Sequence, residues 1–154
     1  IGTLGSMLAS EKEKMADPAF MYKLAERLLS WNRLDDADIR YGAVVKLDPE
    51  NKSGDADDAL LQQAWVCRKK ENYDCAVAHA KDCYNRWPSG EMADDATIYI
   101  AYYSAKGGKK AEAIAAYNEY LKKWPKGEDV EFAKEQIAEL EKPAETTPSE
   151  GGSQ

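Results

Sequence analysis

The chain has 154 residues, enough for one domain with a buried core, and its 44% hydrophobic and 32% charged residues form an ordinary globular balance. The 28 acidic residues outnumber the 21 basic ones and give a formal charge of −7. This excess argues against binding to nucleic acid or to anionic lipid, because both require a concentrated basic surface. No uninterrupted apolar stretch is long enough for direct membrane insertion.

The chain begins with a segment of weak pattern, residues 1–16. No secretory signal is recognisable there. We expect this segment to be a leader left from expression, a linker, or a short helix near residues 7–15.

One spacing pattern then occurs three times. An alanine is followed twelve positions later by a second alanine, and twelve positions after that by a proline: Ala25, Ala37 and Pro49; Ala64, Ala76 and Pro88; Ala101, Ala113 and Pro125. Small facing residues let two helices pack closely, and proline ends a helix because it lacks an N–H and clashes with the preceding turn. The pattern predicts three helical hairpins, over residues 17–50, 55–88 and 92–125.

The predicted helices of these hairpins cover, in chain order, residues 17–31, 34–47, 55–70, 73–87, 92–106 and 109–124. Acidic clusters at residues 55–58 and 91–95 come at the start of two of them, where the helix dipole favours negative charge. We interpret these clusters as helix starts. They lack the spaced oxygen ligands and central glycine of a calcium loop.

A seventh helix is expected at residues 128–142, where Ile137-Ala138 repeats the register of Ile100-Ala101. Pro143 ends it, so it has no partner helix and fits a terminal cap over the last open apolar face. Residues 143–154 are rich in Pro, Glu, Thr, Ser and Gly, and we expect a disordered tail because they have no apolar face to bury.

The repeated unit resembles the tetratricopeptide repeat (TPR) family, in which an A-x3-F element and a proline follow a first helix containing L-G-x2-Y. The first copy reads Met21, Leu24, Ala25, Leu28, Ala37, Tyr41 and Pro49. The resemblance covers residues 17–142 and recurs in one frame. It implies an all-α fold, a right-handed α-solenoid of three TPR-like helical hairpins plus a C-terminal capping helix.

The distances between repeats indicate which group of TPR proteins the chain looks like. Successive prolines are 39 and 37 residues apart, instead of about 34, and two copies end in Trp87-Pro88 and Trp124-Pro125. Such repeats look like those of bacterial cell-envelope proteins, of the Tol–Pal-associated periplasmic coordinator and outer-membrane assembly lipoprotein type. The similarity favours the periplasm or cell envelope, with the cytoplasm as the alternative location.

The resemblance also implies a concave groove lined by the first helix of each pair. The residues it places there are Tyr22, Glu26, Leu29, Leu61, Trp65, Arg68, Lys69, Ile98, Tyr99, Tyr102 and Lys106. Aromatic residues and arginine often anchor binding, although an aromatic at helical spacing is equally compatible with a core. The matching positions cannot form the cationic clamp of chaperone-binding members, so we expect an apolar segment of another protein. Tyr41 and Tyr117 match core positions.

Three cysteines lie eight residues apart, at Cys67, Cys75 and Cys83, without a CxxC motif. Cys67 and Cys75 are symmetric about the predicted turn at Glu71. They could form a disulfide if their Cα atoms lie within about 7 Å. The alternative is that Cys67 and Cys83 are small buried hydrophobic residues.

His79, the only histidine, is expected to be solvated on the convex face. Cys75 and Cys83 flank it along one helix, but three ligands in such a row span too far for one tetrahedral ion, so we predict no metal site. The sequence also lacks a nucleophile–base pattern, a phosphate loop and a paired-carboxylate frame. We therefore predict no enzymatic activity and no cofactor.

These observations favour a non-enzymatic scaffold that binds a partner protein or peptide segment in the groove. Two alternatives remain. One is a redox-linked accessory domain of a thiol–disulfide (thioredoxin-like) protein that uses Cys67 and Cys75. The other is a self-assembling module that forms homo-oligomers through an open end of the stack.

Overall fold

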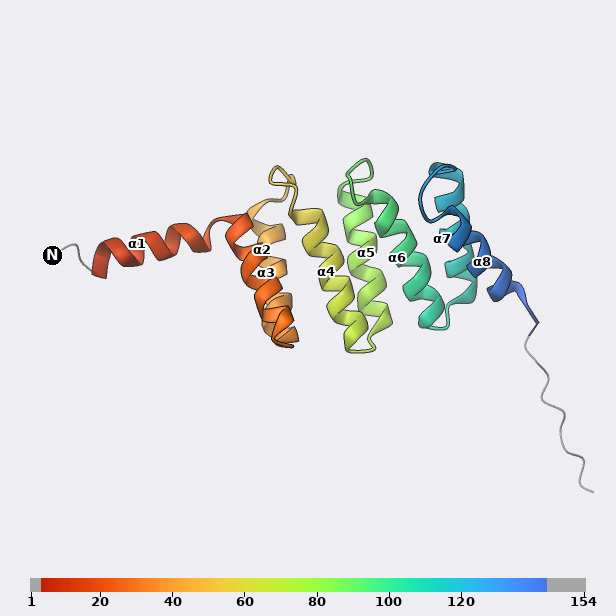
Figure 1. The fold of residues 1–154 in the computed structure, drawn as a ribbon, viewed down its shortest axis with the longest axis horizontal. Coiled ribbons are helices and arrows are strands. Elements are labelled where there is room, and N and C mark those ends of the chain that lie inside the picture. The colour runs from red at the N-terminus through yellow and green to blue at the C-terminus, as the bar shows by residue number, and fades with distance from the viewer. Residues whose placement is uncertain (1–3, 144–154) are drawn as a thin grey trace, which may run out of the picture.

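The computed structural model describes residues 4–143, which form eight helices and no strand. These helices are α1 (Leu4–Met15), α2 (Pro18–Ser30), α3 (Leu34–Leu47), α4 (Ala56–Lys69), α5 (Tyr73–Arg86), α6 (Ala93–Lys106), α7 (Lys110–Lys123) and α8 (Val130–Glu141). Consecutive helices from α2 to α8 stack side by side, whereas α1 extends away from the stack at its N-terminal end (Figure 1). The predicted all-α, TPR-like solenoid is confirmed.

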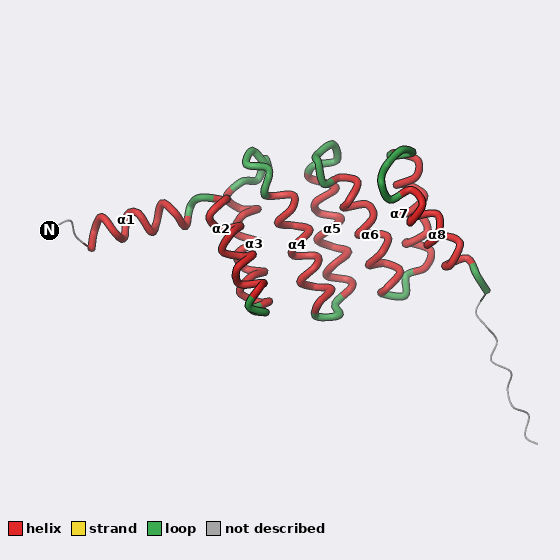
Figure 2. Tube along the Cα trace, in the orientation of Figure 1, coloured by secondary structure: helices red, strands yellow, loops and turns green. Residues whose placement is uncertain are grey.

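The segments between helices are short turns at one end of the stack and longer loops at the other (Figure 2). The short turns close the hairpins α2–α3, α4–α5 and α6–α7, and the longer loops join one hairpin to the next element. Residues 1–3 and the predicted tail beyond Pro143 lie outside the described residues.

The alanines of the repeated frame are all completely buried. Their side chains are 0% exposed: Ala25, Ala37, Ala64, Ala76, Ala101 and Ala113. The predicted core residues Tyr41 and Tyr117 are also 0% exposed, and Cys67 and Cys83 are buried. The packing positions predicted within the three hairpins are therefore confirmed.

The register predicted for the last helix is wrong. Ala138 is exposed, and Ala133 is the fully buried alanine of α8. Around Ala133, the half-buried Val130, Phe132 and Ile137 pack on the core formed by α6 and α7. Within residues 4–143 no helix follows α8, and its register follows the apolar face that α6 and α7 present to it.

The three hairpin turns share one backbone geometry. In each, one residue adopts a positive φ: Asn32 (58°), Glu71 (58°) and Gly108 (79°). The next N–H donates to a carbonyl five residues earlier, in the pairs Arg33 to Leu28, Asn72 to Cys67 and Lys109 to Ser104. This pattern is a Schellman motif, which satisfies the last carbonyls of a helix. Three different turn sequences therefore place the second helix in an equivalent position.

The longer loop between α3 and α4 is organised by the buried carboxylate of Asp48. This carboxylate accepts hydrogen bonds from the N–H groups of Lys52 (2.9 Å) and Ser53 (2.7 Å) and from the Ser53 hydroxyl (2.7 Å). Burial raises the pKa of Asp48, but these hydrogen bonds outweigh burial and hold its pKa below the ordinary value. Asn51 Oδ1 then accepts from the Ala56 N–H (2.8 Å), so the residues added to this repeat start α4.

Candidate functional site

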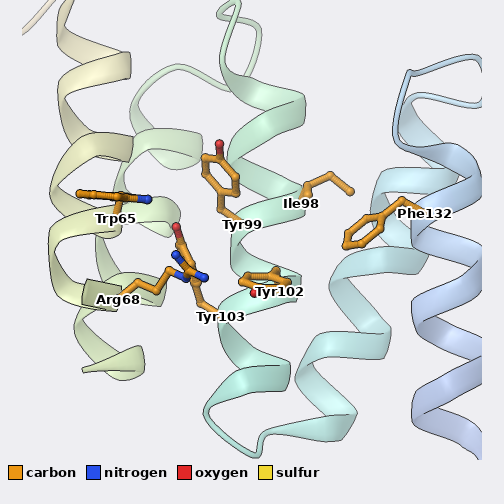
Figure 3. A pocket seen from close by; sticks show the side chains of 7 residues that line it. All are labelled: Trp65, Arg68, Ile98, Tyr99, Tyr102, Tyr103 and Phe132. Carbon is orange, nitrogen blue, oxygen red and sulfur yellow. The ribbon is translucent and has the colours of Figure 1, made fainter. Parts of the chain in front are cut away.

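Side chains from α4, α6 and α8 converge on one hollow of the surface (Figure 3). Its volume is about 280 Å³, and its lining residues are Trp65, Arg68, Ile98, Tyr99, Tyr102, Tyr103 and Phe132. Trp65 and Tyr102 are half-buried, so each presents part of its ring to solvent while the rest packs on the stack. An aromatic surface of this kind can bury apolar groups of a ligand.

Two further hollows extend this one over the first helices of the hairpins. One, of about 160 Å³, is lined by Asp58, Leu61, Gln62, Trp65, Met92, Asp95 and Tyr99. The other, of about 320 Å³, is lined by Glu26, Leu29, Ser30, Tyr41, Gln62 and Trp65. Trp65 lines all three hollows, which we together call the aromatic groove.

Most residues expected in a groove line these hollows, but not all do so in the same way. Leu61 and Ile98 are almost fully buried, at 4% and 6% exposure, and form the groove floor. Glu26 is exposed, and Leu29, Arg68 and Tyr99 also contribute surface.

Three of the expected residues lie beside the hollows. The Tyr22 hydroxyl donates to Asp58, and its ring contacts Tyr41 edge-on at a centroid distance of 5.5 Å. Lys69 and Lys106 place their ammonium groups over groove rings, 5.0 Å from the centroid of Trp65 and 5.5 Å from that of Tyr102.

Sequence reasoning missed Phe132, Tyr103, Asp58 and Asp95 as groove residues. Phe132 belongs to α8, where the sequence pattern indicates a different buried face from the one observed. The sequence therefore gives no signal that Phe132 lies beside α6. The sequence indicates Asp58 and Asp95 only as helix-start residues. They do lie in the first turns of α4 and α6, and they also line the groove.

Positive and negative side chains lie at opposite ends of the groove, along the axes of α4 and α6. The cations at the groove, Arg68, Lys69 and Lys106, belong to the last turns of α4 and α6, whereas Asp58 and Asp95 belong to the first turns. Arg68 lies 5.9 Å from the ring centroid of Tyr102, and none of the three cations forms an ion pair within the part of the chain that the structure describes. Cations therefore flank the aromatic centre at one end and carboxylates at the other.

Burial shifts the ionisation of several groove residues. Desolvation raises the pKa of Asp95, and the neighbouring carboxylates of Asp94 and Asp129 raise it further. Desolvation also raises the pKa of Tyr103 to about 12, and the pKa of Tyr99 is raised for the same reason. These tyrosines are neutral hydroxyls at neutral pH, so the centre of the groove carries no phenolate charge.

A second cluster lies at the α4–α5 turn. Cys67 and Cys75 form a disulfide with their Cα atoms 5.7 Å apart, while Cys83 is free and buried. Burial raises the pKa of the Cys83 thiol to about 12. His79 is half-buried, and its ring nitrogen lies within 4.8 Å of the Cys67 and Cys75 sulfurs. The cysteine that joins Cys75 and His79 comes from the facing helix, and is Cys67 instead of Cys83.

No helix in the described range 4–143 is long and apolar enough to cross a membrane. Residues 54–134, which include α4 to α7 and the first part of α8, match the YfiO family, described as outer membrane lipoprotein. Among curated proteins, none matches the chain. The match spans more than half of the sequence and confirms the resemblance to TPR-type cell-envelope proteins. The chain belongs to the YfiO family of outer membrane lipoproteins.

Proposed function

We propose that this chain is a non-enzymatic scaffold of the bacterial cell envelope whose aromatic groove holds an apolar segment of a partner protein. Membership of the YfiO family supports a protein-interaction role in the envelope. The observation that carries the proposal is the continuity of the groove, because the half-buried ring of Trp65 lines all three hollows. A half-exposed tryptophan at the centre of a surface is a frequent binding hot spot.

The charges at the two ends of the groove specify the partner segment. An acidic group near Arg68 and Lys106, and a basic group near Asp58 and Asp95, would complement the groove. Asp58 and Arg68 are ten residues apart on α4, which corresponds to about 15 Å along the helix. About five residues in extended conformation cover that distance. The best partner is therefore a short apolar segment with an acidic and a basic end.

The test uses the full chain and an array of overlapping synthetic segments from bacterial envelope proteins. Segments that bind are then titrated against the chain by fluorescence anisotropy. We expect Trp65→Ala and Tyr102→Ala each to weaken binding by about tenfold or more, because truncation of a hot-spot aromatic typically costs 2 kcal/mol or more. Circular dichroism should show unchanged helicity, since both side chains are only half-buried.

Trp31→Ala is the matched control, because Trp31 is 61% exposed at the end of α2 and lines none of the three hollows. It should leave binding within about twofold. Arg68→Glu should reverse the preference for acid-ended over base-ended segments. Equal binding by the Trp65→Ala and Trp31→Ala variants would refute the groove assignment.

A further inference from the structure

We propose that the reduced chain binds one Zn²⁺ ion through Cys67 Sγ, Cys75 Sγ and His79 at the α4–α5 turn. The same two sulfurs form the disulfide of the oxidised chain, so the disulfide and the metal site exclude each other. This site lies at a hairpin turn, and none of its three residues lines the aromatic groove. It therefore does not depend on the proposed partner binding.

The hairpin turn brings the three ligands together. Cys67 lies in the last turn of α4, and its carbonyl accepts from the Asn72 N–H (2.9 Å). The Asn72 side chain in turn accepts from the Cys75 N–H (3.1 Å) and caps the start of α5. His79 follows Cys75 by four residues, so both side chains lie on the same face of α5.

The three ligand atoms are close enough to bind a single ion once the disulfide is reduced. The three ligand atoms lie within 4.8 Å of one another. Tetrahedral zinc, with bonds of 2.3 Å to sulfur and 2.0–2.1 Å to nitrogen, holds such atoms about 3.5–3.8 Å apart. The His79 nitrogen already lies within 4.8 Å of both sulfurs. The two sulfurs are bonded to each other in the oxidised chain, so they must separate on reduction before one ion can bind both. Cys75 and His79 are half-buried, so the site is open to solvent and leaves a fourth position for water.

Formation of the zinc site requires reduction of the disulfide followed by loss of the two thiol protons. A dithiol reductant supplies two electrons and two protons to the Cys67–Cys75 disulfide and is itself oxidised to a disulfide. Zn²⁺ then displaces the two thiol protons to solvent and forms two Zn–S bonds and one Zn–N bond to the neutral imidazole. Two thiolates neutralise the charge of the ion, which suits a partly buried site.

The experiment compares the oxidised chain with the chain reduced by a phosphine, which takes its oxygen from water and becomes a phosphine oxide. Co²⁺ serves as the spectroscopic probe, and competition with a chromogenic chelator measures Zn²⁺ affinity. We expect one metal ion per reduced chain, with thiolate-to-Co²⁺ charge-transfer absorption, and none per oxidised chain. His79→Ala should weaken Zn²⁺ binding by more than about tenfold, because loss of an outer-shell group alone costs about 10–100-fold.

Cys83→Ser is the matched control, since Cys83 is a buried cysteine on α5 outside the cluster. It should retain full binding, whereas Cys75→Ser should lose the charge-transfer band. His79→Asn provides a second variant that preserves a polar side chain and should behave like His79→Ala. An absent band in the reduced chain, or equal affinity of the His79 variants and the unmodified chain, would overturn the proposal.

Discussion

Two buried tyrosines on α7 differ in whether their hydroxyl groups have a hydrogen-bond partner. Tyr117 and Tyr120 are both 0% exposed. The Tyr120 hydroxyl accepts from the Asp129 N–H (3.1 Å), whereas the Tyr117 hydroxyl has no partner within residues 4–143. A desolvated hydroxyl without a partner lowers stability, while a hydrogen-bonded one usually raises it.

We therefore expect opposite effects from the same substitution. Tyr117→Phe should leave the free energy of unfolding unchanged or raise it by up to about 1 kcal/mol. Tyr120→Phe should lower it by about 1–2 kcal/mol, because the Asp129 N–H loses its acceptor. Urea unfolding followed by circular dichroism measures both values. A loss above about 1 kcal/mol for Tyr117→Phe would show that its hydroxyl does have a partner.

The sequence predicted Tyr117 as a core residue, and this is confirmed. It could not predict the hydrogen bond of Tyr120, because the donor is nine residues away in the loop before α8. The position of a tyrosine in a repeat indicates that its ring is buried. Whether its hydroxyl forms a hydrogen bond depends on a single neighbouring atom from another segment.

At the scale of elements, the three equivalent hairpin turns differ in how well their residues suit a positive φ. Glycine at position 108 has no Cβ to clash, and asparagine at position 32 tolerates this conformation. Glu71 has neither property, although its φ is 58°. The α4–α5 turn is therefore the one of the three with an unsuited residue at this position.

Glu71→Gly should raise the free energy of unfolding by about 1 kcal/mol, because it removes the Cβ contact that disfavours this conformation. The comparison is Glu71→Ala, which retains the Cβ and should change stability by less than about 0.5 kcal/mol. Both are measured by urea unfolding with the Cys67–Cys75 disulfide intact. If Glu71→Ala stabilises as much as Glu71→Gly, the side chain and not the backbone is responsible.

On the scale of the whole molecule, the stack has an interior and two ends. The helices α4, α5 and α6 each pack on a neighbour at either side, whereas α8 packs chiefly on α7 and α1 extends from the stack (Figure 1). In a repeat array, stability is the sum of each unit and its contacts with neighbours. Elements with one neighbour therefore open more readily than those with two.

Hydrogen exchange followed by mass spectrometry should show this gradient directly. We expect the amides of α4, α5 and α6 to exchange slowest, those of α8 faster, and those of α1 fastest. The comparison is internal to one sample, so it needs no variant. Protection of α8 equal to that of α5 would mean that the stack unfolds as a single cooperative unit.

Helices, hairpins and their packing alanines could be predicted from the sequence because each depends on local spacing. The A-x11-A-x11-P frame placed six alanines, and all are completely buried. The proline distances and the Trp-Pro endings also indicated the cell-envelope resemblance that the family match confirms. The repetition supports these predictions, because the three copies of one unit pack their helices through the same small residues.

The sequence by itself thus determined the TPR-like stack and its family. Only the tertiary structure decided that α8 buries Ala133, that Phe132 faces the groove, and that His79 lies beside the sulfurs of both Cys67 and Cys75. The physical reason is the same in each case. These contacts form between separate helices, and the packing of the helices sets their relative positions. No fixed spacing along the chain encodes those positions.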